Sequence, residues 1–140
     1  MSEAIDNFKS AIQFAMSIRP KVGGFPVLAE VMRMAGIKQN LWYLPSCQSI
    51  YITNKGNIVS QGTPLVTGEL DIPEFNKEAL IKAIRVDQAG ESTFSEFLQA
   101  SWKAGVFHYI VDLERRTVTY YSVLGEFYVE EYPAVDVKRL

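Results

Sequence analysis

Apolar residues near the start of the chain recur at spacings of three and four, which is the pattern of a helix with one buried face. The residues on this face are Ile5, Phe8, Ile12, Ala15 and Met16. Ser2 is a suitable N-cap, because its hydroxyl can accept a hydrogen bond from the first turn. The helix is predicted to end at Arg19, because the residue before a proline is pushed out of the helical region.

Gly23 and Gly24 form a loop before a second predicted helix, which starts near Pro26 and stops at Gly36. Proline suits the first turn of a helix, and glycine adopts the left-handed conformation that ends many helices. Extended structure is predicted next, at residues 41–44, 49–53 and 58–61, with a hairpin turn at residues 54–57.

The second half of the chain repeats this order of elements. Asn76 is the predicted N-cap of a third helix, and Thr93 with Glu96 forms a capping box for a fourth, which ends at Gly105. Three further strands are predicted at residues 106–113, 117–124 and 126–132. The whole chain therefore reads as two helices and three strands, followed by two helices and three strands.

This order suggests an internal duplication. Phe25 and Phe94 lie 94 − 25 = 69 positions apart. The same offset pairs helix stops, turn glycines and strand tyrosines: Gly36 with Gly105, Gly56 with Gly125, and Tyr51 with Tyr120. The sequence thus predicts a single α+β domain over residues 1–140, made of two pseudo-repeats at about 1–69 and 70–140.

Each predicted half has a three-stranded antiparallel sheet whose apolar face two helices would cover in part. We expect the halves to form either one six-stranded sheet backed by four helices or two facing layers. Unpaired outer strands would remain available for pairing between chains, so a homodimer is also expected.

Composition narrows the class of protein. The chain has 140 residues, of which 48% are hydrophobic and 21% charged, which is typical of a globular domain. Its formal charge of −2 argues against nucleic acid as a partner, and no apolar run is long enough to span a membrane. The single cysteine, Cys47, excludes an internal disulfide, and the first residues lack the apolar core of a signal peptide, so a cytoplasmic location is expected.

No motif predicts a catalytic residue, a metal site or a cofactor. Cys47 lies between predicted strands without a basic neighbour to stabilise a thiolate, which favours a structural thiol. His108 is the only histidine, and with one cysteine it does not make a zinc site. Both are kept only as candidate neighbours of a site, and a purely structural role is the alternative for each.

The loop before the second helix is the best candidate for ligand binding. Arg19 and Lys21 supply two cations, and the backbone N–H groups at Gly23 and Gly24 precede a helix N-terminus, a place suited to an anion. The equivalent loop in the second half, residues 88–95, has no cation and an ordinary capping box. The alternative is a turn tightened by glycine whose basic side chains are simply solvated.

Five segments also resemble a known family over nearly the whole chain. They are SIRPKVGGFP (17–26), LPSCQS (44–49), QGTPLVTG (61–68), DQAGE (87–91) and VTYY (118–121). They resemble the domain of unknown function 1398 family of bacterial and prophage proteins, some of which are labelled phage envelope protein. The resemblance implies no catalytic residues and no specific function.

The sequence therefore favours a non-catalytic, dimerising protein that binds a small anionic ligand or a protein partner. A small enzyme without a recognisable signature and a phage-associated structural protein are the alternatives. A pocket that joined Arg19 and Lys21 with Cys47 and His108 would favour the enzyme.

Overall fold

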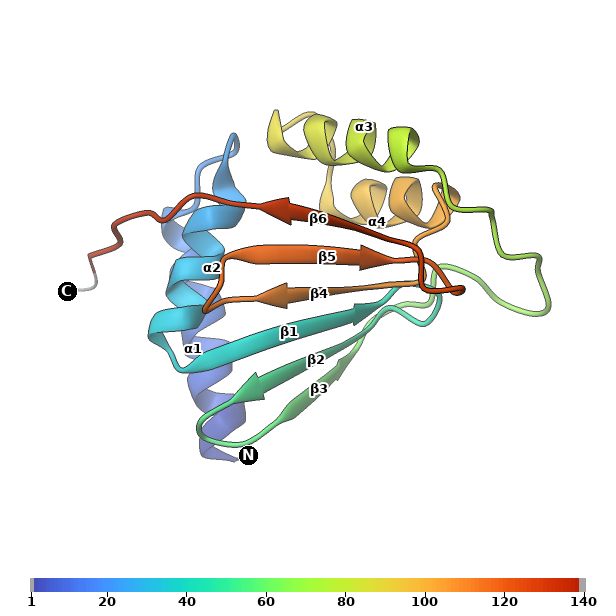
Figure 1. Cartoon of the computed structure of the whole chain (residues 1–140). Coiled ribbons are helices and arrows are strands. Elements are labelled where there is room, and N and C mark those ends of the chain that lie inside the picture. Colours follow the sequence, from blue (N-terminus) through green and yellow to red (C-terminus); the bar gives the residue numbers. More distant parts are fainter. Residues whose placement is uncertain (1, 139–140) are drawn as a thin grey trace.

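A computed structural model of the chain describes residues 2–138, which form four helices and six strands (Figure 1). The elements, in chain order, are α1 (Glu3–Ile18), α2 (Gly24–Met34), β1 (Ile37–Tyr43), β2 (Gln48–Thr53), β3 (Ile58–Gln61), α3 (Lys77–Gln88), α4 (Phe94–Lys103), β4 (His108–Asp112), β5 (Thr117–Tyr121) and β6 (Phe127–Glu131). All neighbouring strands are antiparallel, in the order β3-β2-β1-β4-β5-β6. The α+β class is confirmed, and the single six-stranded sheet is the arrangement found.

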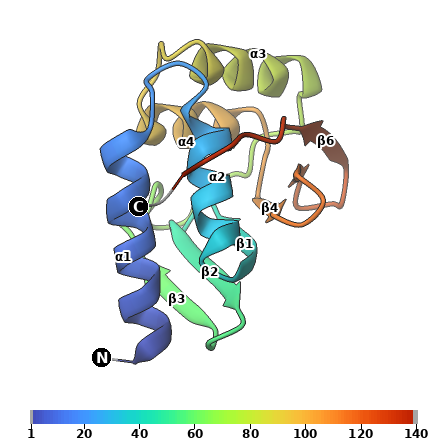
Figure 2. The same cartoon turned by 90° about the vertical axis from the view of Figure 1, so that its left-hand side faces the viewer.

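The helices lie on one side of the sheet only. α1 packs on α2 and α3 packs on α4; α1 lies behind the strands and α3 above β6 in Figure 1, and α1 lies to the left of the strands and α3 above them in Figure 2. The opposite face of the sheet, called here the outer face, has no helix over it. None of the helices within residues 2–138 has the length and hydropathy needed to cross a bilayer.

Side-chain caps define three of the four helix starts, as the sequence predicted. Ser2 accepts a hydrogen bond from the Ile5 N–H, and Asn76 accepts one from the Ala79 N–H. Thr93 forms the predicted capping box with Glu96 at the start of α4. Such caps are worth about 1 kcal/mol each, because they satisfy N–H groups that have no partner inside the helix.

Several boundaries differ from the prediction: the strand predicted at residues 117–124 ends at Tyr121, the one predicted at 106–113 starts at His108, and two earlier elements start before their predicted positions. β1 starts at Ile37 rather than at residue 41, because a bulge between Ile37 and Gln39 breaks the alternation of buried and exposed residues that would reveal the strand. α2 starts at Gly24, two residues before Pro26, since Gly23 turns into the helix with a φ of 66°.

The two halves meet at the central strands β1 and β4 with matching contacts. The Leu44 N–H donates to the Phe107 carbonyl at 2.9 Å, and the equivalent Leu113 N–H donates to the Lys38 carbonyl at 3.0 Å. Leu41 and Ile110, which are 110 − 41 = 69 positions apart, face each other in the register. A pseudo-twofold axis therefore passes through the centre of the sheet, between these two residues.

Candidate functional site

A cavity of about 490 Å³ lies between the helices and the inner face of the sheet, where the two halves meet. Its walls come from α1, α2, the α1–α2 loop, the central strands, α3, α4 and the segment that follows β6. Most of the lining is apolar and aromatic: Phe8, Ile12, Met16, Phe25, Leu28, Met32, Trp42, Ile84, Phe94, Phe97, Val111 and Val118. A cavity of this size, with few polar groups, is typical of a site for a small molecule.

Residues that lie 69 positions apart in the chain line the cavity on both sides of the pseudo-twofold axis. Phe25 and Phe94, the equivalent first-turn aromatics of α2 and α4, both line it, as do Tyr51 and Tyr120 on the equivalent strands β2 and β5. The cavity is therefore a product of the two halves together, and neither half encloses it alone.

Tyr109 and Tyr120 supply hydroxyl groups to the floor of the cavity. Their ring centroids are 5.4 Å apart, and their side chains are only 5% and 6% exposed. No hydrogen bond joins either hydroxyl to another residue of the described chain, yet neither oxygen is fully enclosed, so the free hydroxyls open into the cavity. Burial raises the pKa of both tyrosines well above the ordinary value, so both remain protonated donors at neutral pH.

Trp42 is held rigidly at the same floor. Its indole N–H donates to the Asn40 side-chain oxygen at 2.9 Å, and the Asn40 amide in turn donates to the Ile50 carbonyl at 3.2 Å. The Trp42 ring also meets the Phe94 ring edge-on, with centroids 5.0 Å apart. The ring is thus held by polar and aromatic contacts together.

The predicted loop residues Arg19, Lys21, Gly23 and Gly24 all line the mouth of this cavity. The α1–α2 loop packs here against the α3–α4 loop: the Gly23 N–H donates to the Gln88 carbonyl at 3.3 Å, and a Cβ at Gly90 would lie 3.1 Å from the Lys21 side chain. α2 is the one helix in residues 2–138 without a side-chain cap.

Arg19 lies across the start of α2, with its cation free of an ion pair. A Cβ at position 24 would be 2.7 Å from Arg19 Cγ and Nε, so Gly24 makes room for that side chain. Within the described residues its side chain donates one hydrogen bond, to the Met16 sulfur, 4.0 Å from Nη1. Within residues 2–138 neither Arg19 nor Lys21 has a carboxylate within 4.0 Å.

Three carboxylates also reach the lining, and they belong to Asp87, Glu130 and the exposed Glu131. Burial raises the pKa of Asp87 despite the opposing influence of Arg19 and a hydrogen bond from Ser92 at 3.4 Å. The charge of the Glu130 carboxylate is compensated inside the protein, because Arg85 forms an ion pair with it and the Tyr128 hydroxyl donates a hydrogen bond to it at 2.6 Å. Glu130 has its pKa lowered, since these donors outweigh the effect of burial. Asp87 is therefore the acid that opposes an anion near Arg19.

Cys47 and His108 lie elsewhere. Cys47 is buried in the β1–β2 turn, where burial raises its pKa, and it does not line the cavity. His108 precedes Tyr109 on β4 and has the opposite orientation, so it lies on the outer face between the rings of Tyr43 and Tyr121. The structure therefore does not bring these two residues together with Arg19 and Lys21.

No group of three or more potential metal ligands occurs in the described residues. The floor hydroxyls, Trp42 and Asp87 were not predicted as site residues from the sequence, where the strand aromatics were assigned to the core. The available signal was that Tyr51 and Tyr120 occupy equivalent positions on the inner face of both halves.

Comparison with known proteins identifies the family. A family model described as "Protein of unknown function (DUF1398)" matches residues 13–131. Similar chains include uncharacterized proteins of Mycobacterium bovis and Mycobacterium tuberculosis, each 47% identical over 136 residues, which is 97% of this chain and 83% of the relative. Their names state no activity and no association with phage.

Proposed function

The chain belongs to this family of proteins of unknown function, and we propose from its structure that it is a binding protein for a small amphipathic molecule with an apolar body and an anionic group. The observation that carries the proposal is the cavity of about 490 Å³, with an apolar wall and two unpaired cations at its mouth. Three features support it in turn.

The cavity wall supports an apolar ligand body. Aromatic and aliphatic side chains from both halves line the space, and Trp42, Phe94 and Phe25 present rings that suit stacking or edge contacts. Transfer of an apolar group from water into such a site contributes about 25 cal/mol per Å² of surface removed from water. Most of the affinity would come from this term.

The residues at the mouth of the cavity favour a ligand that carries an anionic group. Arg19 offers a bidentate guanidinium, Lys21 a point charge, and the uncapped start of α2 the positive end of a helix dipole. Because neither cation is neutralised by a carboxylate of the described chain, a bound carboxylate or sulfonate would be the first close partner for both.

The tyrosine hydroxyls at the floor of the cavity favour a ligand that has a second polar group at its far end. The hydroxyls of Tyr109 and Tyr120 make no hydrogen bond within the described residues and open into the cavity, so both are available to a ligand. A ligand carbonyl or hydroxyl in this position would satisfy them. The ligand class is thus an acid with a hydrophobic middle and a hydrogen-bonding tail.

A binding role is favoured over catalysis because Cys47 and His108, the usual kinds of nucleophile and general base, lie away from the cavity. We place this activity in the cytoplasm, where a lone buried thiol such as Cys47 stays reduced.

The test is a calorimetric titration with a matched pair of probes, decanoate and decanol, which share a chain and differ in charge. The wild type is expected to bind decanoate more tightly than decanol. Arg19→Ala should weaken decanoate binding about ten- to hundredfold, which corresponds to about 1.5–3 kcal/mol for a charge-assisted contact, and should leave decanol unaffected. Equal binding of the two probes would overturn the anionic part of the proposal, and binding of neither would overturn the whole.

A further inference from the structure

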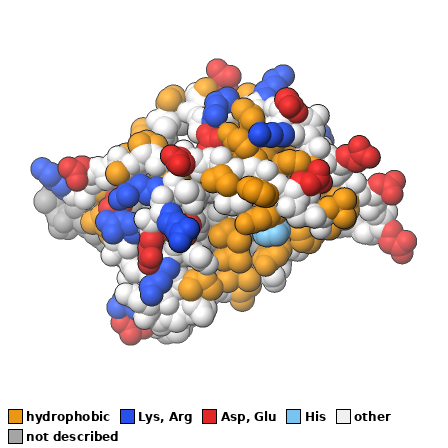
Figure 3. Space-filling view, in the orientation of Figure 1, with side chains coloured by type: hydrophobic (Ala, Val, Ile, Leu, Met, Phe, Trp, Pro, Cys, Tyr) orange, Lys and Arg blue, Asp and Glu red, His pale blue; other side chains and the backbone are white. Residues whose placement is uncertain are grey.

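The outer face of the sheet is apolar and uncovered. Its outward-pointing aliphatic and aromatic residues come from all six strands and include Leu41, Tyr43, Ile50, Ile52, Val59, Ile110, Tyr121, Phe127 and Val129. Val59 and Phe127 are each 62% exposed, although they lie at opposite edges of the sheet. Figure 3 shows these hydrophobic side chains gathered over the front of the sheet around the histidine.

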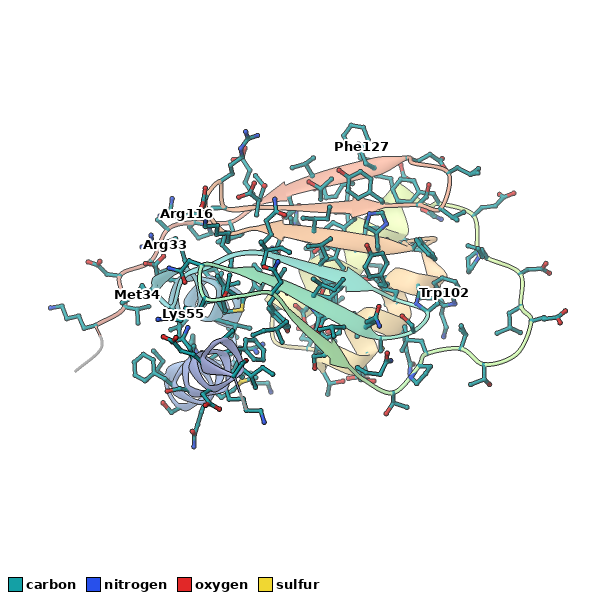
Figure 4. All side chains as sticks on the ribbon, turned by 90° about the horizontal axis from the view of Figure 1, so that it is seen from below. Arg33, Met34, Lys55, Trp102, Arg116 and Phe127 are labelled. Carbon is teal, nitrogen blue, oxygen red and sulfur yellow. The ribbon has the colours of Figure 1, made fainter. Side chains whose placement is uncertain are left out.

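An aromatic row crosses four strands of this face. Tyr43 is paired with His108, His108 with Tyr121, and Tyr121 with Phe127, and their ring centroids are 5.5, 4.8 and 6.3 Å apart. Figure 4 shows Phe127, the last of the row, pointing away from the sheet on the side opposite to α1. Each ring of the row therefore packs against its neighbour on the next strand.

Charge is confined to one end of this face. Lys38 is the only lysine or arginine on the six strands, and it lies at the bulge that opens β1. Asp112 and Glu131 lie near the same end, on β4 and β6. The centre of the face has no lysine or arginine, so it does not suit nucleic acid or an anionic membrane, both of which need these residues against phosphate. An uncharged centre is self-complementary, because two copies can meet without burying like charges.

The size of the face also fits contact with a second copy. Six strands about 4.8 Å apart, with five residues each at about 3.3 Å, give a flat sheet area of roughly 400 Å² per copy. The accessible surface is larger, because the side chains project from the sheet. Two such faces with their relief reach the roughly 1,000 Å² in total that a specific interface needs. Aligned packing of two sheets face to face is a common way to bury such surfaces.

We propose that two copies of this chain form a symmetric dimer by packing the outer faces of their sheets together, with the twofold axis near Leu41 and Ile110. The two cavities then lie on the outside of the dimer, each behind its own sheet, so ligand binding and dimer formation use opposite faces of the same strands.

Sedimentation equilibrium on the full chain tests the proposal. The wild type is expected at twice the chain mass of 15.8 kDa at micromolar concentration. Val59→Glu and Phe127→Glu place a charge on opposite edges of the face at well-exposed positions, so the fold should survive. Each should raise the dimer dissociation constant at least about thirtyfold, as loss of an interface hot spot does.

Leu70→Glu is the matched control, because Leu70 is also 62% exposed but lies in the β3–α3 connection. It should leave the dimer intact. A monomeric wild type at about 100 μM would overturn the proposal, and so would a dimer that resists both outer-face substitutions, since that dimer would use another surface.

Discussion

Cys47 and Arg116 are 116 − 47 = 69 positions apart, and they are the two non-glycine residues in residues 2–138 with a left-handed backbone, at φ values of 52° and 57°. They occupy the equivalent β1–β2 and β4–β5 turns of the two halves. Left-handed backbone is unusual for such residues, so its recurrence at this offset is a structural signature of the pseudo-repeat. An ancestral duplication remains our interpretation of it.

Replacing Arg116 with glycine should stabilise the β4–β5 turn. A left-handed conformation costs a non-glycine residue about 1–2 kcal/mol in the folded state. Glycine avoids this cost but loses more conformational entropy on folding, which offsets about 0.5–1 kcal/mol of the gain. Arg116→Gly is expected to raise the free energy of unfolding by roughly 0.5–1 kcal/mol in urea titrations. Its neighbour Arg115 has no left-handed φ, so Arg115→Gly should lower the same quantity. Equal losses in both variants would contradict the strain argument.

Gly105 should tolerate a side chain less well than Gly125. Their φ values are 89° and 90°, so alanine meets the same backbone strain at each. A Cβ at Gly105 would lie 2.5 Å from the Glu74 carbonyl oxygen and the Phe75 Cα, whereas nothing lies within 4 Å at Gly125. Gly125→Ala should therefore cost about 1–2 kcal/mol, and Gly105→Ala a further 1–3 kcal/mol for the clash with backbone. Thermal and urea unfolding of the two variants measure this difference. Similar losses of stability in both would mean that the backbone around Glu74 and Phe75 moves to admit the side chain.

Tyr109→Phe should leave the free energy of unfolding within about 0.5 kcal/mol of the wild type, because the Tyr109 hydroxyl makes no hydrogen bond inside the described chain. Asn40→Ala is the contrasting variant. Asn40 is equally buried but bonds to Trp42 and Ile50, so its loss should cost about 1–3 kcal/mol. A loss of more than about 1 kcal/mol in Tyr109→Phe would show that its hydroxyl has a structural partner.

Asp87 should make anion binding depend on pH. Burial raises its pKa above the ordinary 3.8, so the carboxylate, which in its ionised form repels an anion at Arg19, gains its proton at a higher pH than an exposed aspartate does. As pH falls through this raised pKa, Asp87 gains a proton and the repulsion disappears. The affinity for a sulfonate, which stays ionised, should therefore rise on acidification in the wild type.

Asp87→Asn removes this charge at every pH. It should bind the sulfonate more tightly than the wild type at pH 7 and show little further gain on acidification. Fluorescence titration with anilinonaphthalene sulfonate at several pH values gives both curves. Parallel curves for the two proteins would show that Asp87 does not face the bound anion.

Much of the secondary structure could be predicted from the sequence, because the signals that start and stop helices depend on a few neighbouring residues. The caps at Ser2, Asn76 and Thr93 and the stops at Gly36 and Gly105 each depend on one or two side chains. β1 was predicted too short, since the bulge after Ile37 interrupts its alternation.

The cavity was not accessible in the same way. Its floor depends on the register that places Trp42 opposite Tyr109 and Tyr109 opposite Tyr120, and its mouth on two loops 69 positions apart that meet in space. The loop before α2 was singled out because its two cations and two glycines depart from the repeat. The structure places it at the cavity mouth, and its role in anion binding remains a prediction.

The most direct test of the central claim is a titration of anilinonaphthalene sulfonate, an apolar anion whose fluorescence rises in apolar sites, against the wild type and three variants. The account predicts one bound dye per chain, binding about ten- to hundredfold weaker in Arg19→Ala, and none in Leu28→Trp, which fills the cavity from α2. Leu70→Glu, in the β3–α3 connection and outside the cavity lining, should bind as the wild type does. Dye binding that survives both cavity variants, or that is lost in Leu70→Glu, would contradict the claim that the cavity is the binding site.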